Sequence, residues 1–130
     1  MTNPSDRDRR FMARHPVVFR NIDFDPQRSL MVWGLNVGDG WLPPLDQLVR
    51  DLAVVIQRDG LHDFEIAQVK EKLGELRVYV RGANDQALAL IDAAEARSIE
   101  ICAVCSQHGQ RRSEAWVWTL CDRCHAEARP

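Results

Sequence analysis

The stretch FEIAQVKEKLGELRVYVR, residues 64–81, decides the predicted fold. Two runs that favour β-strands, Phe64 to Lys70 and Glu75 to Arg81, flank a four-residue connection that contains Gly74. In the second run aliphatic side chains alternate with polar ones, as in a strand with one buried face. A connection of this length with a glycine is typical of a β-hairpin, so we predict an antiparallel pair of strands here.

Helical patterns precede and follow the hairpin. Apolar residues recur at helical spacing over residues 41–56, where Asp39 or Gly40 is the predicted helix cap. After the hairpin, Asn84 or Asp85 is predicted to cap a second helix that runs towards the first cysteine pair. The order helix, hairpin, helix predicts an α+β fold, in which a small antiparallel sheet is packed with helices.

The N-terminal part of the sequence carries weaker signals. Ser5 either caps a short helix or belongs to a frayed arm. Short strands are expected at residues 17–19 and 30–35, with Gly34 as a possible bulge. We therefore divide the chain into a polar, partly ordered N-terminal arm, an α+β core and a zinc-binding module: residues 1–29, 30–100 and 101–130.

The composition is typical of a soluble globular protein. Hydrophobic residues make up 45% of the 130 residues and charged residues 28%, with a formal net charge of -2. That balance excludes a whole-molecule attraction to nucleic acid or anionic membranes. The longest apolar runs, residues 52–56 and 87–91, are far shorter than the ~20 residues of a membrane span. No signal-peptide pattern is found, so we expect a cytoplasmic protein, in which paired cysteines are more often metal ligands than disulfides.

All four cysteines lie within the last 29 residues, as the pairs ICAVC and LCDRC with fifteen residues between them. Two residues between the cysteines of a pair allow both thiolates to reach one ion, and two such pairs complete the tetrahedron that zinc prefers. Residues 111–120 are expected to form a short hairpin between the pairs. We predict one structural Zn²⁺ in a treble-clef-like or zinc-ribbon module, held by four ligands: Cys102, Cys105, Cys121 and Cys124.

Other uses of these cysteines are less consistent with the sequence. Familiar iron–sulfur cluster spacings are less symmetric, and disulfides are unexpected in the cytoplasm. The string CDRCH at residues 121–125 matches a c-type haem attachment site, but it would leave the first pair unexplained. His108 and His125 either assist the cysteines or are simply exposed. Because four cysteines leave no open coordination position, we expect the metal to stabilise structure and not to activate water.

The sequence gives no reason to predict an enzyme, because it lacks phosphate-binding, dinucleotide-binding, HExxH and nucleophile-elbow motifs. Asp23, Asp25 and Asp39 are expected in turn and capping roles. We expect a non-catalytic zinc protein that acts through protein–protein interaction. The alternative is a regulatory protein that binds DNA or RNA through its zinc module. Candidate contacts for either role are Arg111, Arg112, Trp116 and Trp118, and the two tryptophans are predicted to alternate on one strand.

Three motifs together resemble an uncharacterised family of short bacterial and phage proteins, often found in prophage-like regions. They are GDGW at residues 38–41, QVKEKLGELRVYV at residues 68–80 and the cysteine pairs. The resemblance implies no established activity. A phage association would favour a small protein that binds and blocks a host machine, for example a defence system. The chain departs from the family pattern in its first 30 residues and at Ser106, where a glycine is expected.

Overall fold

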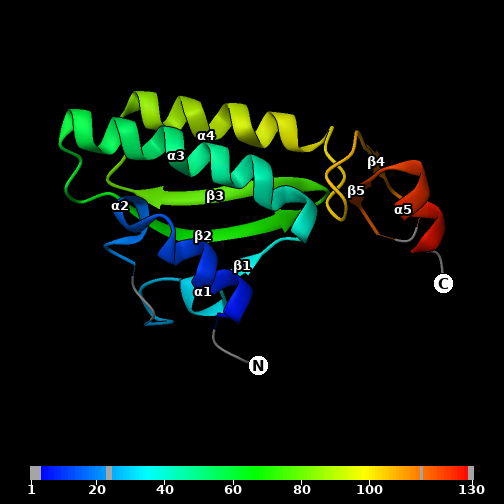
Figure 1. The fold of residues 1–130 in the computed structure, drawn as a ribbon, viewed down its shortest axis with the longest axis horizontal. Coiled ribbons are helices and arrows are strands. Elements are labelled where there is room, and N and C mark those ends of the chain that lie inside the picture. Colours follow the sequence, from blue (N-terminus) through cyan, green and yellow to red (C-terminus); the bar gives the residue numbers. More distant parts are fainter. Residues whose placement is uncertain (1–3, 23–24, 115, 129–130) are drawn as a thin grey trace.

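The protein contains a three-stranded mixed sheet whose strands follow the order β1-β2-β3 (Figure 1). The computed structural model describes residues 4–22, 25–114 and 116–128. β2 (Glu65–Lys72) and β3 (Glu75–Arg81) are antiparallel, which confirms the predicted hairpin, and β1 (Leu35–Asn36) pairs with β2 in parallel. β3 has the predicted bounds, but β2 extends two residues beyond the predicted Lys70, so only Leu73 and Gly74 remain in the turn, both with positive φ. Together with the helices, this sheet confirms the α+β class.

Two long helices pack beside each other along the hairpin, α3 (Leu42–Asp59) and α4 (Asp85–Ser98). Asn84 caps α4, as expected, because its side chain accepts a hydrogen bond from the Ala87 N–H. The predicted cap of the first helix is wrong. Residues 39–41 form the short 3₁₀-helix η2 (Asp39–Trp41), no side chain caps α3, and the Asp39 carboxylate instead pairs with Arg7 at 2.8 Å.

The N-terminal residues form two helices, α1 (Asp6–Ala13) and α2 (Pro16–Phe19). Ser5 caps α1 by accepting a hydrogen bond from the Asp8 N–H at 3.1 Å. The strand predicted at residues 17–19 is wrong, because Pro16 stands at the first helical position, where its missing N–H is not needed. Residues Phe11, Met12, Val18 and Phe19 belong to the same hydrophobic core as α3 and the sheet. The division of the chain at residues 29 and 100 stays a prediction.

The strand predicted at residues 30–35 is mostly a 3₁₀-helix, η1 (Met31–Trp33), and only Leu35 of that range belongs to β1. Gly34 separates the two elements, with a φ of 78° that favours glycine. No helix in the described part of the chain is long and apolar enough to cross a membrane. The predicted role of Asp23 lies outside the described residues.

Side chains of α4 occupy the open edge of β3. The Ser98 hydroxyl accepts the Leu76 N–H at 2.9 Å, and the Glu95 carboxylate accepts the Val78 N–H at 3.0 Å. Ser98 is buried, and burial raises the pKa of the Glu95 carboxyl above its ordinary value. Helix α4 therefore satisfies backbone groups that a fourth strand would otherwise bind.

The outer edge of β1 is occupied in the same way by α1. The buried Asp8 carboxylate accepts the Leu35 N–H at 3.0 Å, and the Arg7 guanidinium donates to the Leu35 carbonyl at 2.9 Å. Arg7 also pairs with both Asp8 and Asp39. This network fixes α1 against the segment that leads from β1 into α3.

Candidate metal centre

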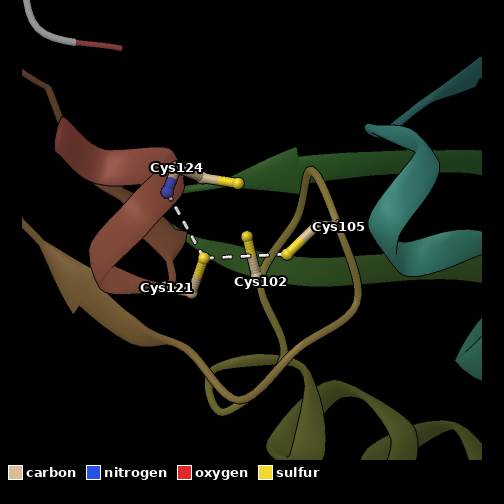
Figure 2. A group of neighbouring side chains, drawn as sticks. All are labelled: Cys102, Cys105, Cys121 and Cys124. Carbon is tan, nitrogen blue, oxygen red and sulfur yellow. Dashed lines mark hydrogen bonds between the residues drawn. The ribbon is translucent and has the colours of Figure 1, made fainter. Parts of the chain in front are cut away.

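Three short elements after α4 position the four cysteines. Cys102 and Cys105 lie in the turn that follows α4. β4 (Gln110–Arg112) then pairs with β5 (Trp118–Leu120), which confirms the hairpin predicted at residues 111–120. Cys121 is the N-cap of α5 (Asp122–Glu127), and Cys124 lies in its first turn. Figure 2 shows the four side chains converging from the turn and from α5.

The sulfur positions fit one ion. The four ligand atoms lie within 4.8 Å of one another, and the Sγ atoms of Cys105 and Cys121 are 3.6 Å apart. A tetrahedral zinc with Zn–S bonds of about 2.3 Å places its ligands about 3.8 Å from each other. A disulfide needs sulfurs about 2.0 Å apart, and all four cysteines are free. An iron–sulfur cluster would hold its thiolates farther apart, because several metal ions and sulfides lie between them. The arrangement therefore fits a single metal ion.

Backbone hydrogen bonds shape the first pair into a compact turn. The Ser106 N–H donates to the Cys102 carbonyl at 3.0 Å, and the Cys102 N–H donates to the Gln107 carbonyl at 2.7 Å. Ser106 has a φ of 74°, a left-handed conformation that glycine adopts without strain. This conformation explains why a glycine would be expected after the second cysteine.

The local field favours a negative charge on one thiol in particular. Burial opposes ionisation of Cys102, but N–H groups of Cys121, Cys105 and Val104 donate to its sulfur and lower the pKa to about 6. Burial raises the pKa of Cys124 to about 12, together with hydrogen bonds to the sulfurs of the other three cysteines. Four adjacent thiolates repel one another, so a full set of charges requires a bound cation.

The turn that carries Cys102 and Cys105, which we call the knuckle (residues 102–106), packs directly against the GDGW segment. A Cβ added to Gly40 would lie 2.1 Å from the Cys102 carbonyl oxygen, and one on Gly38 would lie 2.3 Å from that of Ala103. Both glycines are therefore required by close backbone approach. The sequence of this segment predicts a helix cap and carries one of the three motifs of the resemblance, but it does not predict the contact with the knuckle.

Three hydrogen bonds connect the knuckle region to the GDGW segment. The Gly40 N–H donates to the Ala103 carbonyl at 2.9 Å, and the Ser106 hydroxyl donates to the Gly40 carbonyl at 2.8 Å. The indole N–H of the fully buried Trp41 donates to the Ile101 carbonyl at 2.8 Å. The candidate metal centre is thus attached to the start of α3, about sixty residues earlier in the chain.

The tip of the β2–β3 hairpin supports the other side of the module. The buried Thr119 hydroxyl donates to the Gly74 carbonyl at 2.6 Å, and the Thr119 carbonyl accepts the Ala103 N–H at 2.9 Å. Gly74 also lies against the Trp118 backbone, where an added Cβ would be 3.3 Å from it. β5 therefore lies between the hairpin tip and the knuckle.

The four predicted contact residues have different surroundings. Arg111 is exposed, whereas Arg112 donates to the Leu120 carbonyl and pairs with Asp122 at 2.8 Å. The prediction that both tryptophans alternate on a strand is wrong, because β5 begins at Trp118. Trp116 is 67% exposed, and its ring meets that of Trp118 edge-on at 6.4 Å between centroids.

The histidines do not join the sulfur cluster. Among the described residues, the group that could hold a metal contains only the four cysteines. His108 is exposed, and its neighbour in a β-bridge is Ile101. His125 lies 3.6 Å from Glu114 through its Nε2 atom.

Comparison of this chain with protein-family models, curated proteins and solved structures finds no match. The resemblance to a prophage-associated family therefore stays a prediction.

Proposed function

We propose that Cys102, Cys105, Cys121 and Cys124 bind one structural zinc ion, and that the chain is a non-catalytic protein-interaction module. The convergence of four sulfurs within 4.8 Å is the observation that carries the metal assignment. The succession of knuckle, hairpin and helix supports a treble-clef-like description of the module. Four thiolates would complete the coordination of zinc, so its role is to hold the knuckle, β5 and α5 together.

Exposed apolar side chains beside the cysteine module support an interaction role. Three of them, Leu73, Val104 and Trp116, are at least half exposed. A groove of about 490 Å³ runs between β1, the hairpin and the knuckle, and Val104 and Trp118 line it. Exposed apolar patches with tryptophan are typical of protein-binding surfaces. If the chain belongs to a prophage-associated family, the expected partner is a component of the host cell, such as a defence protein.

Metal analysis of the purified chain tests the proposal. We expect one zinc per chain and a colourless solution, and we expect Cys102→Ser and Cys121→Ser to lose the ion. Ser113→Ala, an exposed residue between the two pairs, is the control that should retain zinc. Iron with visible absorption would refute the zinc assignment, and so would full zinc retention in both cysteine variants.

Nucleic-acid binding is the second candidate, because the exposed Trp116 ring and the exposed Arg111 lie in the same module. This hypothesis predicts that Trp116→Ala and Arg111→Glu each weaken the binding of single-stranded DNA or RNA in a gel-shift assay. Arg97→Glu, at an exposed position on α4, is the charge-matched control. Arg112 is a poor choice for this test, because its guanidinium already binds Asp122 and Leu120.

A further inference from the structure

A second surface, away from the cysteines, combines an apolar hollow with arginines. We call it the arginine cleft. Its volume is about 380 Å³, and Arg9 of α1 and Arg20 just after α2 line it together with five apolar residues: Met12, Ala13, Pro16, Phe19 and Ile22. Figure 1 shows α2 at the opposite end of the molecule from α5, so this surface is separate from the candidate metal centre.

The arginines around the cleft carry uncompensated charge. Arg9, Arg10, Arg14 and Arg20 are exposed, and none of them forms an ion pair with a residue that the structure describes. The nearby Asp8 carboxylate is buried and bound to Arg7. Among the described residues, four further carboxylates lie near this surface. Asp6 on α1 is exposed, and Asp63 and Glu65 share a neighbouring hollow with Arg20. Asp46 pairs with His15 and Arg50, and Glu65 pairs with Arg81. The surface is therefore locally positive in a chain whose net charge is -2.

Contacts with the protein hold three of these guanidinium groups in place. Arg9 donates to the Pro4 carbonyl at 3.0 Å, and Arg20 donates to the Leu61 carbonyl at 3.3 Å. The Arg14 guanidinium lies over the Phe11 ring at 5.3 Å from its centroid. Positioned arginines lose less side-chain entropy on binding a carboxylate than free ones do.

We propose that the arginine cleft binds an acidic segment of a partner protein, in which an apolar side chain is flanked by aspartate or glutamate. The apolar side chain would enter the hollow, and carboxylates on either side of it would bind Arg9 and Arg20. The inference rests on the proposed function as an interaction module, and it adds the chemistry of the partner.

The position of the charges favours a peptide over other anions. Arg9 belongs to α1 and Arg20 follows α2, and both line the apolar floor, so an occupant that carries negative charge on both sides of an apolar centre complements the cleft. A lipid carries its charge at one end only. Nucleic-acid bases stack on exposed aromatic rings, whereas Phe19, the aromatic residue of the cleft, is only 5% exposed. An acidic peptide with one apolar anchor meets both requirements.

Selection from a random-peptide display library, followed by anisotropy titration of the selected peptide, tests this inference. We expect peptides with a leucine or phenylalanine flanked by acidic residues. Arg9→Glu and Arg20→Glu should each weaken binding about tenfold, since a hydrogen bond to a charged group is lost. Ala13→Glu, an exposed position on the cleft floor, should also weaken it. Arg97→Glu on α4 is the matched control, and its affinity should equal that of the unchanged protein.

Several results would overturn the inference. The inference is refuted if the selected peptides lack acidic residues. It is also refuted if Arg9→Glu and Arg20→Glu bind the selected peptide as tightly as the unchanged protein does. A different outcome is that the cleft binds single-stranded RNA or phosphatidylserine vesicles through these arginines and binds no acidic peptide. That result would assign the cleft to another class of partner and would also refute the inference. Zinc content and circular dichroism are measured on the same samples. If the zinc-loaded, folded wild-type protein binds no acidic peptide, only the cleft is refuted, whereas a metal-free wild-type protein refutes the proposed function.

Discussion

Replacing Gly40 by alanine should disturb the metal centre without touching a cysteine. The new Cβ would lie 2.1 Å from the Cys102 carbonyl oxygen and within 2.7 Å of the Ala103 and Val104 backbone. Ordinary contact begins at 3.4 Å, so the knuckle would have to retreat by about 1 Å. The three atoms nearest to the new Cβ all belong to the backbone of the knuckle, so no flexible side chain can move aside to make room.

The retreat would break three hydrogen bonds that connect the knuckle region to Gly40 and Trp41. Each contributes about 1 kcal/mol net, so we expect Gly40→Ala to lower the free energy of unfolding by about 3 kcal/mol. Because the knuckle carries Cys102 and Cys105, zinc affinity should fall as well. Urea unfolding in excess zinc, followed by tryptophan fluorescence, measures the first effect, and competition with a chromophoric chelator measures the second.

Gly60→Ala is the matched control for this substitution. Gly60 has a φ of 64°, but the nearest atom to an added Cβ is a His62 side-chain nitrogen at 3.6 Å. We expect a backbone penalty of about 1 kcal/mol and unchanged zinc affinity. If Gly40→Ala destabilises the protein no more than Gly60→Ala and retains zinc equally well, the proposed role of the glycine contact is refuted.

Two further predictions concern buried polar groups. Thr119→Val should lower the free energy of unfolding by about 1 to 2 kcal/mol, because the Gly74 carbonyl would lose the buried hydroxyl that donates to it at 2.6 Å. An unchanged midpoint of urea unfolding would contradict this prediction. Burial raises the pKa of Glu95 in the folded chain above the ordinary value of 4.5. The protonated Glu95 carboxyl therefore stabilises the folded chain fully below the ordinary value of 4.5, and this stabilisation is lost as the pH rises through the pKa of the folded chain. Glu95→Gln should remove this loss and gain stability relative to the unchanged protein towards neutral pH. Urea unfolding between about pH 5 and pH 8 tests it, and parallel curves for the two proteins would contradict it.

The features that the sequence predicted correctly depend on short-range patterns. The hairpin follows from alternation along residues 75–81, and the Asn84 cap follows from a polar residue before a helical stripe. The four sulfurs also lie together as expected. The hairpin, the cap and each cysteine pair join residues that are close in the chain, so local rules determine them. The two cysteine pairs are fifteen residues apart, and the β4–β5 hairpin between them brings them together.

The errors arise where distant contacts decide the conformation. Residues 17–19 are β-branched and aromatic, which favours a strand, but burial in the core shared with α3 and the sheet selects a helix, in which Pro16 takes the first position. β1 is only two residues long, and its parallel pairing with β2 depends on a partner more than thirty residues away. The close approach of Gly40 to Cys102 is likewise invisible to any local pattern, because it joins segments about sixty residues apart.

The closure of both sheet edges has a consequence for self-association. An exposed strand edge can pair with the edge of another molecule and start aggregation. Here Ser98 and Glu95 accept two backbone N–H groups of β3, and Arg7 and Asp8 bind the backbone of Leu35 on β1. These contacts leave fewer unpaired backbone groups at the edges with which another molecule could pair. Ser98→Ala would leave the Leu76 N–H at the edge of β3 without its acceptor. We expect this substitution to lower stability and also to favour aggregation through that edge.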